Sequence, residues 1–260
     1  MSETNGIAMP WGTFSYRRAG RGRPFVLVHP LALSSRLWEP IAEDFLPGHD
    51  LVMPDVRGHG ASQWDGTPYA IEDVAEDLRV LLDALGIGRC ALLGMSMGGC
   101  VAMTFAARYP DRVDRLMLCD TTAWYGADAP EKWRERAHAA ETKTRDAQIP
   151  FQTDRWFSEA FRHEHPDIVE HAANVFRSTS REAHAAACRA LGAFDLRQRL
   201  GNIKANTLVV TGEGDYATPP AMGRALADGI PRAKFAIVPD VRHMAVMESA
   251  SLREELQAFA

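Results

Sequence analysis

Short apolar runs recur along the chain and are separated by longer stretches of helical character. Strands that alternate with helices in this way favour a parallel sheet, because each helix returns the chain to the edge where the next strand begins. We therefore predict an α/β fold whose mostly parallel sheet is flanked by helices on both faces. The predicted strands span residues 25–28, 51–53, 90–93, 115–119, 207–211 and 234–238.

The pattern changes once, after Asp120. From residue 121 to about residue 190 the strand runs stop, and the composition turns to alanine, arginine, glutamate and histidine with scattered aromatics, which favours helices. The chain of 260 residues is long enough for one sizeable core. We predict a core made of residues 1–120 and 191–260, with a helical insertion at 121–190 that is a candidate lid.

A serine between glycines follows the run 90–93. Residues 94–98 read Gly-Met-Ser-Met-Gly and open an apolar helical stretch. A serine at such a strand-to-helix turn is a nucleophile elbow, in which the glycines let neighbouring backbone approach the strained turn. The sequence thus predicts Ser96 as a catalytic nucleophile.

An elbow serine needs a base, and in enzymes with this elbow the chain order is serine, acid, histidine. Asp215 lies in the loop after the run 207–211, and His243 lies in the loop after the run 234–238. We predict Asp215 as the acid and His243 as the base. Asp120 is the alternative acid, because it ends the run 115–119 and some hydrolases take their acid from that position.

The tetrahedral intermediate of acyl transfer needs two backbone N–H donors for its oxyanion. The residue after the nucleophile, Met97, offers one. The other comes from an early loop, here residues 29–33 after the first predicted strand. Pro30 has no N–H, so position alone predicts Leu31 as the second donor.

Aromatic and basic residues of the insertion are candidates for a substrate pocket. The tryptophans Trp124, Trp133 and Trp156 suit an apolar wall, although packing between helices is the more common role of such residues. An arginine can grip a carboxylate with two parallel hydrogen bonds. The candidates are Arg134, Arg136 and above all Arg155.

With these motifs the chain resembles the α/β-hydrolase-fold serine hydrolases and, among them, the 3-oxoadipate enol-lactone hydrolases of aromatic catabolism. The resemblance spans the whole length, and residues 212–220 with Asp215 are its most diagnostic part. Two places depart from it: His29-Pro30 replaces an expected asparagine-serine pair, and 244–246 replaces a run containing serine. Other supporting segments are 55–60, 94–99, 119–122, 155–157 and 193–197.

The resemblance implies an α/β-hydrolase fold with a helical cap over the nucleophile. It implies a triad of Ser96, His243 and Asp215 that cleaves a small carboxylic ester or lactone through an acyl-enzyme, without a cofactor. The two departures leave this chemistry intact but bear on the substrate. The alternatives are a broad carboxylesterase or perhydrolase, a carbon–carbon bond hydrolase, and a slowly turning over ligand sensor.

Composition and charge narrow the classes of binding partner that the sequence predicts. The chain has 29 basic and 34 acidic residues, a formal net charge of −5, so no basic surface for nucleic acid or an anionic membrane is indicated. Four unpaired, irregularly spaced cysteines and the absence of a signal sequence favour a cytoplasmic protein. We predict a small-molecule substrate and no metal, since His163 and His165 lack a third ligand; His59 is assigned a structural role.

Overall fold

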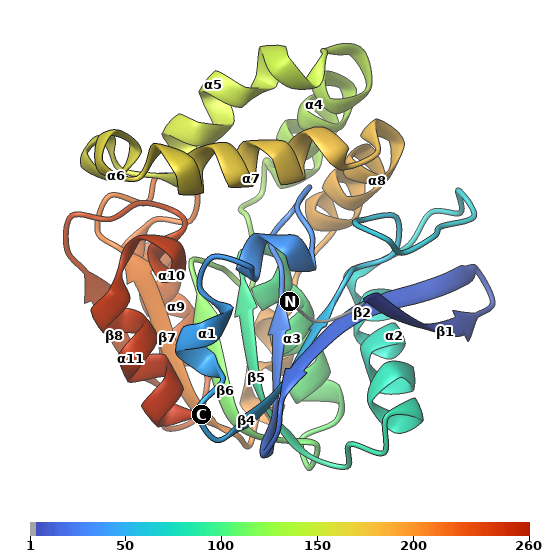
Figure 1. Cartoon of the computed structure of the whole chain (residues 1–260), viewed down its shortest axis with the longest axis vertical. Helices are drawn as coiled ribbons and strands as arrows, with labels where there is room; N and C mark the ends of the chain where they lie inside the picture. The colour runs from blue at the N-terminus through green and yellow to red at the C-terminus, as the bar shows by residue number, and fades with distance from the viewer. Residues whose placement is uncertain (1–3) are drawn as a thin grey trace.

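A mostly parallel sheet forms the centre of the molecule. A computed structural model describes residues 4–260, and its eight-stranded sheet has the order β1-β2-β4-β3-β5-β6-β7-β8 (Figure 1). The pairs β1/β2 and β2/β4 are antiparallel, and the other neighbouring pairs are parallel. The strands are β1 (Thr4–Met9), β2 (Gly12–Gly20), β3 (Arg23–Val28), β4 (His49–Pro54), β5 (Cys90–Met95), β6 (Val113–Cys119), β7 (Asn206–Gly212) and β8 (Lys234–Val238).

The two faces of the sheet bury separate hydrophobic clusters. Along β3, Val26 and Val28 belong to one cluster while Phe25 and Leu27 belong to the other, as alternation in a strand requires. The first face is covered by α2 (Ile71–Ala84), α3 (Met97–Arg108) and α9 (Pro220–Gly229), and the second by α1 (Ala42–Phe45), α10 (Ala245–Glu248) and α11 (Ala250–Phe259). The predicted α/β class, with helices on both faces of a mostly parallel sheet, is confirmed.

A group of helices, which we call the cap, lies between β6 and β7 in the chain. Figure 1 shows it beyond the carboxyl ends of the parallel strands. Its helices begin at residues suited to that place: Thr144, Ser158 and Ser180 accept hydrogen bonds from the first turns of α5, α6 and α8. The cap helices are α4 (Ala129–Thr142), α5 (Arg145–Trp156), α6 (Glu159–Glu164), α7 (Pro166–Ser178) and α8 (Arg181–Gly192).

The amino-terminal hairpin is the element that the sequence pattern did not predict. β1 and β2 form an antiparallel edge, and in β1 no residue is fully buried. An edge strand with little burial carries a weak hydrophobic pattern, which explains the omission. All four cysteines are unpaired, as predicted, and their side chains are buried. Within residues 4–260 no helix has the length and apolar character needed to cross a membrane.

Candidate active site

Ser96 lies at the sharp junction of β5 and α3. Its backbone has φ 54° and ψ −118°, a strained conformation for a residue with a side chain. The neighbouring positions require glycine, because a side chain there would collide with backbone atoms. A Cβ on Gly94 would lie 2.2 Å from the carbonyl oxygen of Gly98, and one on Gly98 would lie 2.1 Å from that of Val28. The junction therefore has the geometry expected of a nucleophile elbow.

The structure brings Ser96, His243 and Asp215 into one hydrogen-bonded chain. His243 Nε2 lies 2.9 Å from Ser96 Oγ, and His243 Nδ1 lies 2.8 Å from Asp215 Oδ2. All three side chains are buried. They come from the turn after β5 and the loops after β7 and β8, which meet at the carboxyl edge of the sheet. Such a chain can draw the proton from a serine hydroxyl.

Asp215 is held as an anion beside His243. Its carboxylate accepts hydrogen bonds from the N–H groups of Ala217 and Thr218 and from the Thr218 hydroxyl. Burial alone would raise the pKa of Asp215, but His243 and these hydrogen bonds outweigh it and lower the pKa. An ionised acceptor at Nδ1 keeps the imidazole proton there, which leaves Nε2 free to accept from Ser96.

Asp120, the alternative acid, lies at a different place in the site. Its carboxylate accepts one hydrogen bond from the Gly212 N–H at 2.9 Å and another from the Ala245 N–H at 3.0 Å. It makes no hydrogen bond to His243. Burial, with the negative charge of Asp215 adding to it, raises the pKa of Asp120 well above its usual value. Asp120 thus bridges the loops that carry Asp215 and His243.

The two predicted oxyanion donors belong to residues near the serine, since Met97 follows Ser96 in the chain and Leu31 lines the same cavity. Met97 is the first residue of α3, and Leu31 follows Pro30 in the loop after β3. Among residues 4–260 neither N–H has a protein acceptor. The Leu31 loop is tied to the cap, because the Thr179 hydroxyl donates to the Ala32 carbonyl oxygen at 2.9 Å. Both N–H groups are therefore available to an external oxyanion.

A small cavity lies over Ser96, between the sheet edge and the cap. The volume that the centre of a water-sized sphere can occupy in this cavity is about 20 Å³, which is enough for about one water molecule. Its lining includes Leu31, Ser96, His243 and Thr218 from the core. The cap, with the segment leading into it, contributes Tyr125, Trp133, Arg136, Gln152, Arg155, Trp156 and His184.

Three of the four predicted pocket residues line this cavity: Trp133, Trp156 and Arg155. Trp124, the fourth, is not among the residues that line it. Trp124 forms an isolated backbone bridge with Asp195, and the Arg197 guanidinium lies 3.6 Å from the centre of its ring. The segment that precedes the cap therefore packs this side chain against Arg197.

Two arginines face the cavity without an acidic partner. Among the described residues, neither Arg136 nor Arg155 forms an ion pair or donates a hydrogen bond; the Arg136 guanidinium lies 4.2 Å from the Trp133 ring centre. Burial lowers the pKa of both, and that of Arg155 to about 10, with the charge of Arg136 adding to the effect. Arg134 is exposed. The cavity is therefore positively charged.

Gln152 and His184 were missed by the sequence analysis. Gln152 is 7% exposed, and its side chain has no hydrogen-bond partner among residues 4–260. Neither residue lies at a recognisable spacing from a sequence motif. Only the packing of α5 and α8 turns both side chains toward Ser96. The Gln152 amide borders the cavity without a partner in the protein, so a polar ligand or water in the cavity can complete its hydrogen bonds.

The remaining histidines have other surroundings. His59 is buried, its Nδ1 donates to the Arg57 carbonyl oxygen, and its ring lies 5.4 Å from that of His29. Burial lowers the pKa of His29 to about 4 and that of His59 to about 3. His165 packs against Phe161. Within residues 4–260 no cluster of three or more histidine, cysteine or acidic side chains is placed to hold a metal ion.

Comparison with known proteins places this geometry in a family. Residues 23–250 match the model of the alpha/beta hydrolase fold. The chain is 29% identical over 225 residues to 3-oxoadipate enol-lactonase 2 of Acinetobacter baylyi, covering 86% of this chain and 82% of that one. The solved enol-lactonase of Burkholderia xenovorans has 32% identity and a TM-score of 0.92, with 98% and 99% coverage. A thermophilic esterase of Thermogutta terrifontis has 31% identity and a TM-score of 0.88, with 99% and 96% coverage. The chain belongs to the α/β-hydrolase fold family, and the predicted resemblance to 3-oxoadipate enol-lactone hydrolases is confirmed.

Proposed function

We propose that this hydrolase uses Ser96, His243 and Asp215 to open a small lactone or ester that carries a carboxylate, as 3-oxoadipate enol-lactone does. The observation that carries the proposal is the hydrogen-bonded chain from Ser96 to Asp215 beneath a positively charged cavity. The similarity to enol-lactonases over most of their length supports it.

In the first step, Ser96 Oγ attacks the substrate carbonyl carbon while His243 Nε2 takes the hydroxyl proton. The electron pair of the carbonyl bond moves onto its oxygen, which the N–H groups of Leu31 and Met97 receive. Asp215 stabilises the imidazolium that forms. The elbow suits this step, because it fixes Oγ beside Nε2 before the substrate arrives.

In the second step, the intermediate collapses and the bond from the carbonyl carbon to the ring oxygen breaks. His243 gives its proton to that oxygen, and for an enol-lactone the released enol becomes a ketone, which makes ring opening hard to reverse. Water deprotonated by His243 then attacks the acyl-enzyme and regenerates Ser96. The net change is the addition of one water to the lactone.

Arg155 and Arg136 are proposed to hold the substrate carboxylate. Both lack an acidic partner among the described residues, and a mostly buried cation without an anion is costly until a ligand supplies one. A bidentate bond from a guanidinium would also orient the ring over Ser96. In this proposal the cap acts as a lid that excludes water and sets the shape of the substrate.

A simple carboxylic ester is the second candidate substrate, favoured by the similarity to the Thermogutta terrifontis esterase. His29 and Pro30 lie next to Leu31, and Met244 follows His243, so both departures from the enol-lactonase pattern are close to the reacting groups. Changes of one or two contacts at such places can alter preference without altering the triad.

Hydrolysis of 3-oxoadipate enol-lactone and of 4-nitrophenyl acetate by the purified protein tests the proposal, with Ser96→Ala as control. We expect a higher kcat/KM for the lactone, and a loss of about 10⁴-fold in Ser96→Ala, as for removal of a triad member. Serine-dependent cleavage of the acetate alone would favour the ester. Unchanged rates in Ser96→Ala would contradict the mechanism.

A further inference from the structure

A second hollow opens on the outer side of the cap, directly behind the cavity over Ser96. It lies between α4, α5 and α8 and has a volume of about 200 Å³. We call it the outer hollow. It shares Arg136, Gln152 and His184 with the inner cavity, so these side chains form a wall one residue thick between the two spaces. The rest of its lining is Ala139, Lys143, Ala147, Gln148 and Phe151.

The shared wall is built from polar groups with unmet hydrogen-bonding capacity. Gln152 is 7% exposed, and its amide has no partner among residues 4–260. Arg136 has no acidic partner in the same part of the chain, and its contact is with the Trp133 ring. His184 is buried and accepts a hydrogen bond from Arg145 at 2.8 Å. Packing and the hydrogen bond from Arg145 hold these three side chains in place. They can move apart when a polar ligand forms hydrogen bonds with them.

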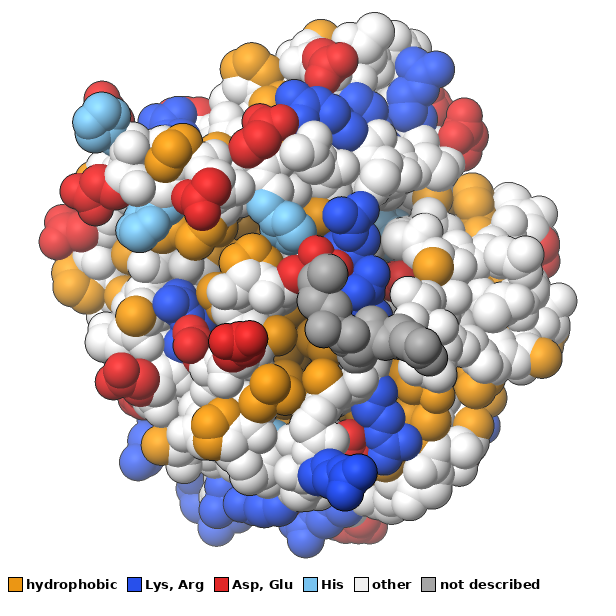
Figure 2. Space-filling view, in the orientation of Figure 1, with side chains coloured by type: hydrophobic (Ala, Val, Ile, Leu, Met, Phe, Trp, Pro, Cys, Tyr) orange, Lys and Arg blue, Asp and Glu red, His pale blue; other side chains and the backbone are white. Residues whose placement is uncertain are grey.

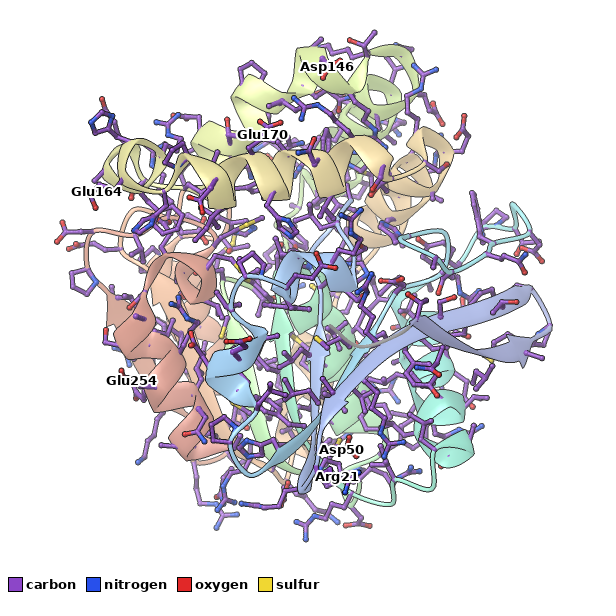
Figure 3. The ribbon with its side chains drawn as sticks, in the orientation of Figure 1. Arg21, Asp50, Asp146, Glu164, Glu170 and Glu254 are labelled. Carbon is purple, nitrogen blue, oxygen red and sulfur yellow. The ribbon has the colours of Figure 1, made fainter. Side chains whose placement is uncertain are left out.

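The lining of the outer hollow is cationic. It includes Arg136 and Lys143 and no acidic side chain. The acidic neighbour Asp146 is paired with Arg177 at 2.8 Å. Figure 3 places Asp146, Glu164 and Glu170 on the outside of the cap. Figure 2 shows acidic and basic side chains interspersed over the face of the cap turned to the viewer, whereas the lining of the hollow has no acidic side chain.

The inner cavity is too small for a substrate as it stands. Its space of about 20 Å³ holds about one water, and most of its walls are buried side chains such as Trp133, Trp156 and His243. A lactone or ester is several times larger than a water molecule, so a wall must move before Ser96 is reached. The wall shared with the outer hollow is lined with groups that a carboxylate would bind.

We infer that small carboxylate-bearing substrates reach Ser96 through the cap, by way of the outer hollow, with Arg136, Gln152 and His184 as the gate. The inference rests on the proposed function of Ser96. Lys143 at the rim attracts the anion, Arg136 receives it at the wall, and Arg155 holds it inside. Charges that line a confined path raise the association rate of an oppositely charged ligand, and salt weakens the effect.

Charge reversal at the rim is the first test. We compare Lys143→Glu with Lys132→Glu, the same change on α4 outside the lining. The substrates are the 4-nitrophenyl monoester of glutaric acid, which is anionic, and 4-nitrophenyl pentanoate, its neutral counterpart. Lys143→Glu is expected to lower kcat/KM for the anionic ester about three- to tenfold at low salt, more than for the neutral ester. The difference should disappear at about 0.5 M salt.

Narrowing the hollow is the second test. Ala147→Trp places a large ring in the lining, whereas Ala160→Trp places one on the exposed surface of α6. We expect Ala147→Trp to lower kcat/KM for both esters several-fold, and Ala160→Trp to match the wild type. Thermal melts confirm that each variant is folded. If both test variants behave like their controls, the route through the cap is wrong.

Labelling of Ser96 by a small neutral phosphonate separates failure of the route from failure of the proposed function. If Ser96 is labelled but the test variants have the same kcat/KM as their controls, only the inferred route is overturned. If Ser96 is not labelled and turnover persists in Ser96→Ala, the proposed function is overturned. The inferred route to Ser96 is then overturned as well.

Discussion

Asp120 and Asp215 are two buried carboxylates at one sheet edge, and their contacts separate their roles. Asp215 meets His243 Nδ1, whereas Asp120 accepts from the backbone of Gly212 and Ala245. Sequence position favoured Asp215 but left Asp120 as an alternative, because both follow strands that end at the same edge of the sheet. The hydrogen bonds support Asp215 as the acid and Asp120 as the group that positions the two catalytic loops.

Substitution of each carboxylate by asparagine tests this assignment. Asp215→Asn should lower kcat about 10⁴-fold, because an amide donates to Nδ1 and leaves the proton on Nε2, where it blocks transfer from Ser96. Asp120→Asn should lower kcat far less and lower the free energy of unfolding by about 1–3 kcal/mol, since its amide faces a backbone N–H. Steady-state kinetics and urea unfolding measure the two effects. A greater loss of kcat in Asp120→Asn would assign Asp120 as the acid.

At the scale of elements, helix α5 of the cap is fastened to both catalytic loops. Asp154 accepts from Tyr216, the residue after Asp215, at 3.0 Å, and from Arg242, the residue before His243, at 2.9 Å. The Met244 N–H also donates to the Trp156 carbonyl oxygen at 2.9 Å. This end of the cap is therefore fixed to the core, and it contributes to the placement of His243.

Loss of the Asp154 carboxylate should affect catalysis as well as stability. In Asp154→Ala we expect kcat to fall about tenfold, because small displacements of a catalytic group are costly. The free energy of unfolding should fall by about 1 kcal/mol, since the bonds are partly exposed. Glu141→Ala is the matched control, because Glu141 pairs with Arg189 inside the cap and does not reach the catalytic loops. Equal kcat in the two variants would argue against a role for Asp154 in placing His243.

At the scale of the whole molecule, buried histidines make the fold sensitive to acid. Burial lowers the pKa of His29 to about 4 and of His59 to about 3, from an ordinary value of 6.5. As the pH falls below about 6.5 the unfolded chain takes up protons that the folded chain does not, so stability is lost toward lower pH. Each histidine contributes up to about 1.4 kcal/mol per pH unit in this window.

The difference in melting temperature between about pH 7 and about pH 5 should therefore be smaller in His59→Asn than in the wild type. Asparagine can keep the hydrogen bond to the Arg57 carbonyl oxygen but cannot take up a proton. His163→Asn, a change at an exposed histidine, should leave the difference unchanged. An equal pH dependence in His59→Asn and the wild type would show that His59 does not contribute to acid unfolding.

The sequence by itself determined the α/β class, the six strands β3 to β8 that pair in parallel, and the residues of the candidate triad, with Asp120 left as an alternative to Asp215. These features follow from local pattern, since a strand, a strained Gly-x-Ser-x-Gly turn and loops after strands all leave marks within a few residues. Only the tertiary structure decided that Trp124 faces Arg197, that Arg136, Gln152 and His184 reach the cavity, and that Asp120 bridges two loops. The reason is physical: the direction of a cap side chain depends on how its helix packs against distant residues, and that packing has no local signature.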